Sequence, residues 1–131
     1  MLSHVVRLRV RWVDTDASGI IHYTAAFRYF EVAEWEFFRK IGILDRMKAG
    51  QFGLPRVSVN ATFRSPLRVD EEIAVHIRLE RIGTTSLTLA LEIFRGETQC
   101  IAGAVTVVFT DAQGASMPIP DEVKRVLTAA D

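Results

Sequence analysis

Residues 13–41 read VDTDASGIIHYTAAFRYFEVAEWEFFRKI, and we expect the remaining elements of the chain to pack around this segment. The segment opens with two aspartates in a turn, continues with Gly-Ile-Ile-His-Tyr, and then shows the only long helical pattern in the sequence. Because apolar residues also occupy much of the remaining surface, helix 23–41 is predicted to be buried on most sides and to end at Gly42. The apolar residues of this helix are Phe27, Phe30, Phe37, Phe38 and Ile41 on one face, with Ala26, Tyr29, Val32, Ala33 and Trp35 beside them.

Alternating apolar and polar residues predict β-strands on both sides of this helix. Residues 5–13 alternate between an apolar face and an arginine face: Val6, Leu8, Val10 and Trp12 against Arg7, Arg9 and Arg11. After Pro55 the same period of two returns in four segments, 57–63, 73–80, 87–93 and 101–109. The short links between them predict that the last four strands are antiparallel neighbours. Residues 44–50 can add one helical turn, and residues 120–130 a terminal helix.

These elements predict one α+β domain over residues 1–131, an antiparallel sheet of about five strands curled around one long helix. A sheet with one apolar face requires a partner layer, and only helix 23–41 is large and apolar enough to supply it. Such a sheet also leaves edges to be covered, and one face of strand 101–109 is small and uncharged. We therefore expect further burial between subunits, in a homodimer or a homotetramer.

The overall composition excludes several kinds of partner and compartment. With 16 basic and 16 acidic side chains the formal net charge is +0, so no nucleic-acid partner is expected. The single cysteine, Cys100, rules out an intrachain disulfide and is typical of a reducing compartment. No run approaches the roughly 20 apolar residues that span a membrane, and the alternating N-terminal residues lack the apolar core of a signal peptide. The protein is therefore expected to be cytoplasmic.

The order of elements and the residues from Asp14 to Tyr23 resemble the hotdog-fold acyl-CoA thioesterases of the 4-hydroxybenzoyl-CoA thioesterase type. Within them, the chain is similar to the branch associated with the bacterial Tol-Pal gene cluster. The family motif is Asp-x-Asp, two residues, Gly, two apolar residues and two aromatic or histidine positions before a helix, and here it reads DTDASGIIHY. That branch usually has Tyr then His, and later Asn and Tyr, where this chain has His22 and Tyr23 and then two alanines. The alanines, Ala25 and Ala26, suggest a roomier pocket.

The resemblance implies a role for several residues of this motif. Asp16 matches the catalytic carboxylate, as nucleophile or as general base on water, and Gly19 matches the glycine that turns the loop onto the helix. The backbone N–H of Tyr23 matches the donor that polarises the thioester carbonyl, and the Thr24 amide lies at the same helix start. A helix N-terminus supplies unpaired N–H groups and roughly half a positive charge. Donors of this kind can each contribute about 3 kcal/mol in the transition state.

These acidic and histidine residues also have simpler interpretations. Most Asp-x-Asp-x-x-Gly loops use their aspartates only to cap a turn, which is the role expected for Asp14. His22 can orient a substrate or a water, or be an ordinary loop histidine. Glu34 falls on the apolar helix face, where a carboxylate must be paired, protonated or next to a cavity. A second hotdog class places its catalytic glutamate on this helix, so Glu34, or Glu31 nearby, is the reserve nucleophile; a salt bridge to a strand arginine is the simpler account.

An acyl-CoA substrate also requires groups that bind its phosphates, and the sequence has no Gly-rich phosphate loop. Arg81 and Ser86 flank a turn that resembles the CoA-contacting region of the family, with Arg64 and Arg68 as further candidates. The three histidines and one cysteine show no metal-ligand spacing, so neither a metal nor a redox cofactor is expected.

The expected activity is hydrolysis of an acyl-CoA thioester to a carboxylic acid and CoA. Two alternatives stay open, because fold alone does not fix function. A non-catalytic acyl-CoA or acyl-carrier binding module would bind its ligand without turnover. A hotdog dehydratase or hydratase would pair a histidine with an acidic residue on the helix, and His22 with Glu31 or Glu34 is a poor match to that spacing.

Overall fold

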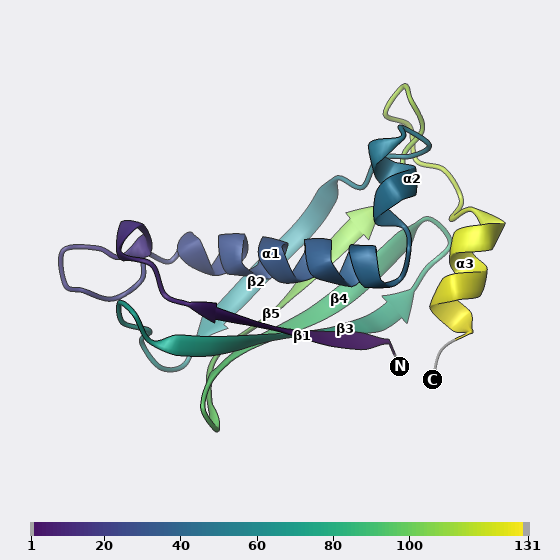
Figure 1. Ribbon diagram of the computed structural model, residues 1–131. Coiled ribbons are helices and arrows are strands. Elements are labelled where there is room, and N and C mark those ends of the chain that lie inside the picture. Colours follow the sequence, from purple (N-terminus) through teal and green to yellow (C-terminus); the bar gives the residue numbers. More distant parts are fainter. Residues whose placement is uncertain (1, 130–131) are drawn as a thin grey trace.

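The computed structural model describes residues 2–129 and places one long helix against a five-stranded antiparallel sheet (Figure 1). The predicted α+β class is therefore confirmed. Among the described residues, no helix combines the length and the apolar character needed to cross a membrane. In chain order the elements are β1 (Ser3–Arg9), η1 (Trp12–Asp14), α1 (Ala25–Lys40), α2 (Leu44–Lys48), β2 (Arg56–Phe63), β3 (Glu72–Ile82), β4 (Ser86–Arg95), β5 (Thr98–Val108) and α3 (Asp121–Thr128).

The strand order is β1-β3-β4-β5-β2, and every neighbouring pair is antiparallel. The expectation that the last four strands are successive neighbours is wrong for β2, which pairs with β5 and not with β3. The link at residues 64–71 is long enough to cross the end of the sheet, unlike a tight hairpin turn. Its first two amides, those of Arg64 and Ser65, donate to Cys100 O on β5 at 2.7 and 3.2 Å. Pro66 has no N–H, so this pairing ends there. β2 has only β5 as a neighbour and is therefore an edge strand.

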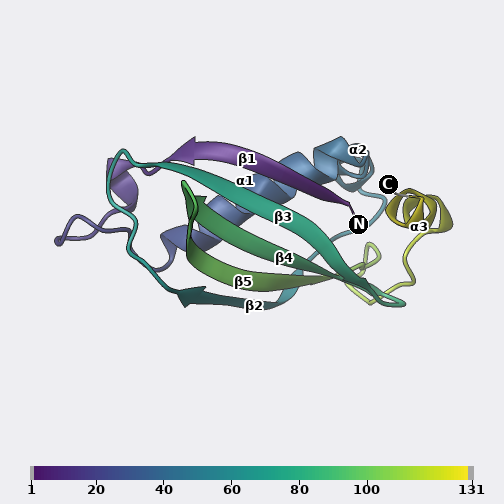
Figure 2. The same cartoon turned by 90° about the horizontal axis from the view of Figure 1, so that it is seen from below.

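Helix α1 lies along the concave face of the sheet, which curls around it as predicted (Figure 2). Phe30, Phe37 and Phe38 are at most 1% exposed and belong to one core with the inward-facing strand residues. The helix is not buried on most sides, however, because Val32 and Trp35 remain 40% and 38% exposed. No second layer of the described chain covers that side of α1, so the sequence pattern overestimated its burial within one protomer.

The first strand ends earlier than its alternating pattern predicts. β1 stops at Arg9, and the chain then turns into η1, where the Trp12 side chain is 83% exposed. Trp12 therefore does not continue the apolar face that ends at the buried Val10. The turn instead directs Asp14, which is only 4% exposed, toward the first turns of α1.

Candidate active site

The loop between β1 and α1 folds back on itself like a small hairpin. Thr15 and Ile21 form an isolated antiparallel bridge across its base. Inside this bridge, Asp16 N donates to Ile20 O at 2.8 Å and Gly19 N donates to Asp16 O at 3.0 Å. Gly19 has a φ of +81°, a left-handed conformation that residues with a Cβ rarely adopt. The expected turning role of Gly19 therefore has a conformational basis, and the loop holds Asp16 in a defined place.

The Asp16 carboxylate is exposed and is held by Ser18. Its Oδ1 accepts hydrogen bonds from Ser18 Oγ at 2.5 Å and from Ser18 N at 2.8 Å. These two donors, the hydroxyl first, lower the pKa of Asp16 below its ordinary value of 3.8. Asp16 is therefore ionised at neutral pH, the form that a nucleophile or a general base requires.

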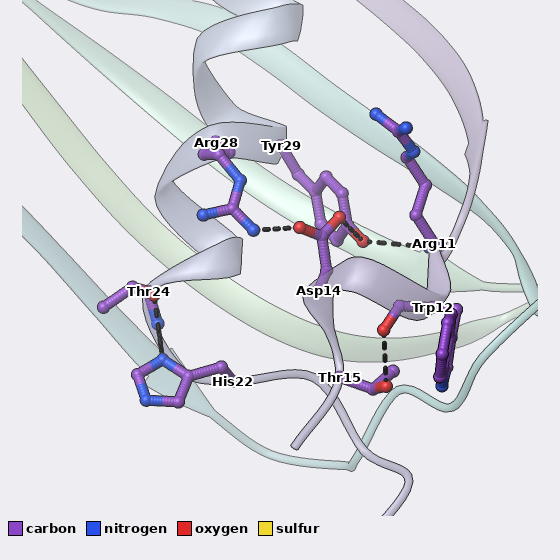
Figure 3. A network of polar contacts seen from close by, with 8 residues as sticks. All are labelled: Arg11, Trp12, Asp14, Thr15, His22, Thr24, Arg28 and Tyr29. Carbon is purple, nitrogen blue, oxygen red and sulfur yellow. Dashed lines mark hydrogen bonds and ion pairs between the residues drawn. The ribbon is translucent and has the colours of Figure 1, made fainter.

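At the start of α1, one backbone donor remains free. Thr24 N donates to His22 Nδ1 at 3.3 Å, and Thr24 Oγ1 lies 2.8 Å from the same nitrogen (Figure 3). Ala25 N donates to His22 O at 2.9 Å. His22 thus occupies the amides of the N-cap residue Thr24 and of Ala25, and its ring stacks on that of Tyr23 with centroids 4.6 Å apart. α1 begins at Ala25, two residues later than predicted, so Tyr23 precedes the helix. Within residues 2–129 the N–H of Tyr23 has no hydrogen-bond acceptor, so a ligand can use it.

Asp16 and Tyr23 line the same cavity, whose volume is about 410 Å³. Main-chain contacts join the two segments that form its wall: Ile21 N donates to Leu67 O at 2.9 Å, and Ile20 forms a β-bridge with Arg68. Beside an apolar cavity, an ionised carboxylate can attack the carbonyl carbon of an apolar acyl group or activate a water, while a free N–H can donate to the carbonyl oxygen. The remaining lining residues are Ile20, Ile21, Phe63, Arg64, Ser65, Pro66, Leu67 and Ile101.

Asp14 is buried and does not line this cavity; with Arg28 and Tyr29 it lines a second one of about 650 Å³. Its Oδ2 accepts a hydrogen bond from Tyr29 Oη at 2.7 Å, and its Oδ1 pairs with the guanidinium of Arg28 (Figure 3). Burial acts to raise the pKa of Asp14, but the hydrogen bonds from Tyr29 and Arg28 outweigh it, and the pKa is lowered. Burial and the bond to Asp14 in turn raise the pKa of Tyr29 to about 12. The side chain of Asp14 therefore joins the loop to α1 and does not cap a turn, the role expected for it.

The reserve carboxylates lie outside the cavity. Glu34 is 2% exposed and pairs with Arg56 of β2, whose Nε donates to Glu34 Oε1 at 2.9 Å. This is the salt bridge to a strand arginine that the sequence suggested as the simpler role of Glu34. Burial raises the pKa of Glu34, and Arg56 opposes that shift. Glu31 and Glu34 line a smaller pocket of about 140 Å³ that contains neither Asp16 nor Tyr23.

Arg81 and Ser86 lie at the opposite end of the sheet from the cavity. β3 has 11 residues and begins at Glu72 beside Arg9. At about 3.3 Å per residue its two ends are therefore roughly 30 Å apart. Arg81 is near the second end, and Ser86 begins β4 there. Within one protomer Arg81 and Ser86 therefore lie far from Asp16, and their expected role as CoA contacts stays a prediction.

No three His, Cys, Asp or Glu side chains in residues 2–129 are grouped closely enough to hold a metal ion. The expected lack of a cofactor stays a prediction. Sequence reasoning missed half of the residues that line the cavity, namely Phe63, Ser65, Pro66, Leu67 and Ile101. The only local signal was the Ser65-Pro66 break, which marks the end of β2 but does not indicate what lies opposite.

An antiparallel sheet of five strands wrapped around one central helix defines the hotdog fold, and comparison with known proteins agrees with it. Residues 10–127 match the family described as the thioesterase-like superfamily. The chain therefore belongs to the thioesterase-like superfamily.

Individual relatives resemble the chain over nearly its whole length. A protein of Aquifex aeolicus, provisionally named an esterase, is 36% identical over 96% of this chain and 98% of its own. A 1,4-dihydroxy-2-naphthoyl-CoA hydrolase of Synechococcus is 26% identical over 92% of this chain and 87% of its own. Among solved structures, a hypothetical protein of Aquifex aeolicus superimposes with a TM-score of 0.90 at 28% identity, over 95% of this chain and 99% of that one. The narrower resemblance to the 4-hydroxybenzoyl-CoA type stays a prediction.

Proposed function

We propose that this protein hydrolyses acyl-CoA thioesters to a carboxylic acid and CoA, with Asp16 as the reacting carboxylate. The observation that carries the proposal is the cavity of about 410 Å³ that Asp16 and Tyr23 line together with mostly apolar residues. Membership of the thioesterase-like superfamily supports the reaction class. The apolar wall suits an aromatic or medium-chain acyl group, and the relative named as a 1,4-dihydroxy-2-naphthoyl-CoA hydrolase supports an aromatic one.

In the proposed reaction the acyl group enters the cavity and its thioester carbonyl lies at the start of α1. The Tyr23 N–H donates to the carbonyl oxygen, and the positive end of the helix stabilises the negative charge that develops there. Asp16 either attacks the carbonyl carbon, forming an anhydride and releasing the CoA thiolate, or takes a proton from the attacking water. In the first route water then hydrolyses the anhydride, which releases the acid and regenerates the Asp16 carboxylate. In both routes the net reaction consumes one water, and the CoA sulfur receives a proton. Rapid-quench mass spectrometry distinguishes the routes, because only the first leaves the acyl group on Asp16.

Release of free CoA from a panel of short, long and aromatic acyl-CoAs tests the proposal directly. We expect the wild type to turn over at least one of them and Asp16→Asn to lose most of that turnover. Turnover that is insensitive to Asp16→Asn would move the chemistry to Glu34 or Glu31. Binding of acyl-CoA without any turnover would favour the non-catalytic binding module.

The dehydratase alternative has less support from the geometry. His22 uses Nδ1 at the start of α1, where Thr24 N and Oγ1 both contact it. Glu34 is paired with Arg56, in a pocket that does not include His22. The histidine and the helix glutamate are therefore engaged separately and do not form an acid–base pair within the protomer.

Arg64 is the cation best placed to bind the phosphates of CoA. It lines the cavity next to Ser65, and its guanidinium has no hydrogen-bond or ion-pair partner within residues 2–129. A charge-assisted hydrogen bond of this kind contributes about 1.5–3 kcal/mol. We expect Arg64→Ala to raise KM about tenfold or more with kcat nearly unchanged, because the contact is equally strong in the ground state and the transition state. Steady-state kinetics beside Arg81→Ala checks this, and a larger KM effect at position 81 would restore Arg81 as the phosphate ligand.

We also propose that β2 joins two copies of the chain in a homodimer. Both sheet edges, β1 and β2, are open within one protomer, and they differ in charge. β1 carries Arg7 and Arg9, which oppose pairing with a second β1. β2 has no charged residue between its first position and Arg64, and its Val57 and Phe63 are 61% and 46% exposed. An uncharged apolar edge favours pairing, and Phe63 also lines the cavity, so this dimer would cover the site.

A lysine at position 57 is expected to prevent this pairing. Val57→Lys places a charge on the β2 edge, where the unmodified valine is 61% exposed. Val5→Lys on the β1 edge is the matched control, because Val5 is also exposed, at 42%. Sedimentation velocity should show an assembled wild type, an assembled Val5→Lys variant and a dissociated Val57→Lys variant. A monomeric wild type, or assembly that survives Val57→Lys, would contradict the β2 interface.

A further inference from the structure

Asp14 contacts both segments that supply the reacting groups of the proposed site. We propose that Asp14 is a positioning residue for thioester hydrolysis. Its carboxylate fixes the Asp16 loop against α1, so that Asp16 and the Tyr23 N–H face one carbonyl group. This inference rests on the proposed function and adds to it a residue that touches no substrate.

The side chain of Asp14 binds two residues in the first turns of α1. Oδ2 accepts from Tyr29 Oη at 2.7 Å and Oδ1 pairs with Arg28, while Tyr29 Oη also accepts from Arg11 N at 3.4 Å (Figure 3). The side chain of Asp14 is 5% exposed and Tyr29 is 4% exposed, whereas the side chain of Arg28 is 57% exposed. A buried carboxylate that receives donors from one helix fixes its own loop relative to that helix.

The main chain of Asp14 holds the two ends of the loop together. Asp14 O accepts from His22 N at 2.8 Å, and Asp14 N donates to Arg11 O at 3.0 Å. His22 immediately precedes Tyr23, and Asp16 follows Asp14 by two residues. Tyr23 is thus next to a residue whose N–H binds Asp14, and Asp16 is two residues from Asp14 itself. A displacement of Asp14 therefore changes the position of both reacting groups.

The position of a reacting group has a large effect on rate. A misplacement of about 1 Å can cost about a hundredfold. Asp14→Asn keeps the size of the side chain and an acceptor for Tyr29, but it removes the charge that pairs with Arg28. We expect this variant to lower kcat about 10- to 100-fold and to change KM less than about threefold, because the contact sets geometry and binds no substrate.

The experiment measures kcat and KM for Asp14→Asn, Tyr29→Phe and Asp111→Asn, at a temperature where circular dichroism shows all of them folded. Tyr29→Phe removes one hydroxyl from the network and keeps the test possible if Asp14→Asn folds poorly. We expect Tyr29→Phe to lower kcat as well, but by a smaller factor than Asp14→Asn. Asp111 is the control, because its carboxylate also accepts two hydrogen bonds, here from the amides of Gln113 at 2.9 Å and Ala115 at 3.0 Å, but it follows the far end of β5. Asp111→Asn should leave kcat unchanged.

A second readout does not depend on turnover. The backbone amide resonance of Tyr23 and the carboxyl resonance of Asp16 should both shift in Asp14→Asn and stay in place in Asp111→Asn. If the wild type hydrolyses no acyl-CoA, the proposed function fails, while these resonances still decide whether Asp14 positions the two groups. Wild-type kcat and unshifted resonances in Asp14→Asn, whatever its melting temperature, would overturn the inference and leave Asp14 a stabilising residue only.

Discussion

Asp16→Asn is expected to lower kcat for acyl-CoA hydrolysis at least about a hundredfold, the usual effect of losing a positioned base or nucleophile. The amide keeps an oxygen that can accept from Ser18 N, so the loop should retain its conformation. It lacks the negative charge that either attacks carbon or takes a proton from water. Residual turnover should come from the Tyr23 N–H and the cavity, which the substitution leaves intact. Free-CoA release from the best substrate of the wild type measures the change.

The pH dependence of the wild type should report the same carboxylate. The Ser18 donors hold the pKa of Asp16 below 3.8, so kcat/KM should not vary with Asp16 ionisation near neutral pH. It should fall only as the pH drops through that lowered pKa. Ser18→Ala removes the hydroxyl, raises the pKa of Asp16 toward 3.8 and moves this acidic limb to higher pH. An Asp16→Asn variant with wild-type turnover, or one that retains the acidic limb, would exclude Asp16 as the reacting group.

The parts of the fold that follow from local patterns were predictable from the sequence. β3, β4 and β5 alternate along their length and are joined by short turns, so their pairing follows from the chain order. The place of β2 was not predictable, because its link at residues 64–71 can lead to either edge of the sheet. Its pairing is set by contacts with β5, which no periodicity in β2 itself indicates.

The same distinction applies to the candidate site. Asp16, Gly19 and Tyr23 lie in one short segment, and the motif placed all three in the loop and helix start where the structure has them. The opposite wall, from Phe63 to Leu67, reaches Asp16 through the pairing of residues that are distant in the sequence. Arg81 was predicted to contact CoA because its turn resembles the CoA-contacting region of the family. That resemblance does not indicate how far the turn lies from Asp16.

Arg56→Met is expected to lower the free energy of unfolding by about 3–5 kcal/mol at neutral pH, as for removal of one partner of a buried ion pair. The Glu34 side chain is 3% exposed, and Arg56 donates to its Oε1 through Nε at 2.9 Å and through Nη2. Without the arginine, the carboxylate is buried and unpaired or must take up a proton. Against the roughly 5–15 kcal/mol that stabilises a typical domain, this is a large loss. Chemical denaturation of both proteins measures it.

The pH dependence of this loss has a definite sign. Burial raises the pKa of Glu34 above 4.5, and Arg56 opposes that shift, so removing Arg56 raises the pKa further. When the pKa of a carboxyl group is higher in the folded state than in the unfolded state, the protein loses stability as the pH rises through the folded-state pKa. The protein regains that stability as the pH falls toward the pKa of the group in the unfolded state. Arg56→Met should therefore be most destabilised at neutral pH and should approach the wild type as the pH is lowered toward 4.5.

Two further variants separate the charge from the packing. Glu34→Gln combined with Arg56→Met removes the buried charge and should recover much of the loss, a coupling that the double-mutant cycle measures. Arg46→Met breaks the more exposed pair with Glu122, whose side chains are 38% and 48% exposed, and should cost at most about 1 kcal/mol. Equal effects of Arg56→Met and Arg46→Met at neutral pH would mean that Glu34 gains little from its partner. Glu34 would then be a carboxylate available for chemistry, and its reserve role as the nucleophile would become the hypothesis to test.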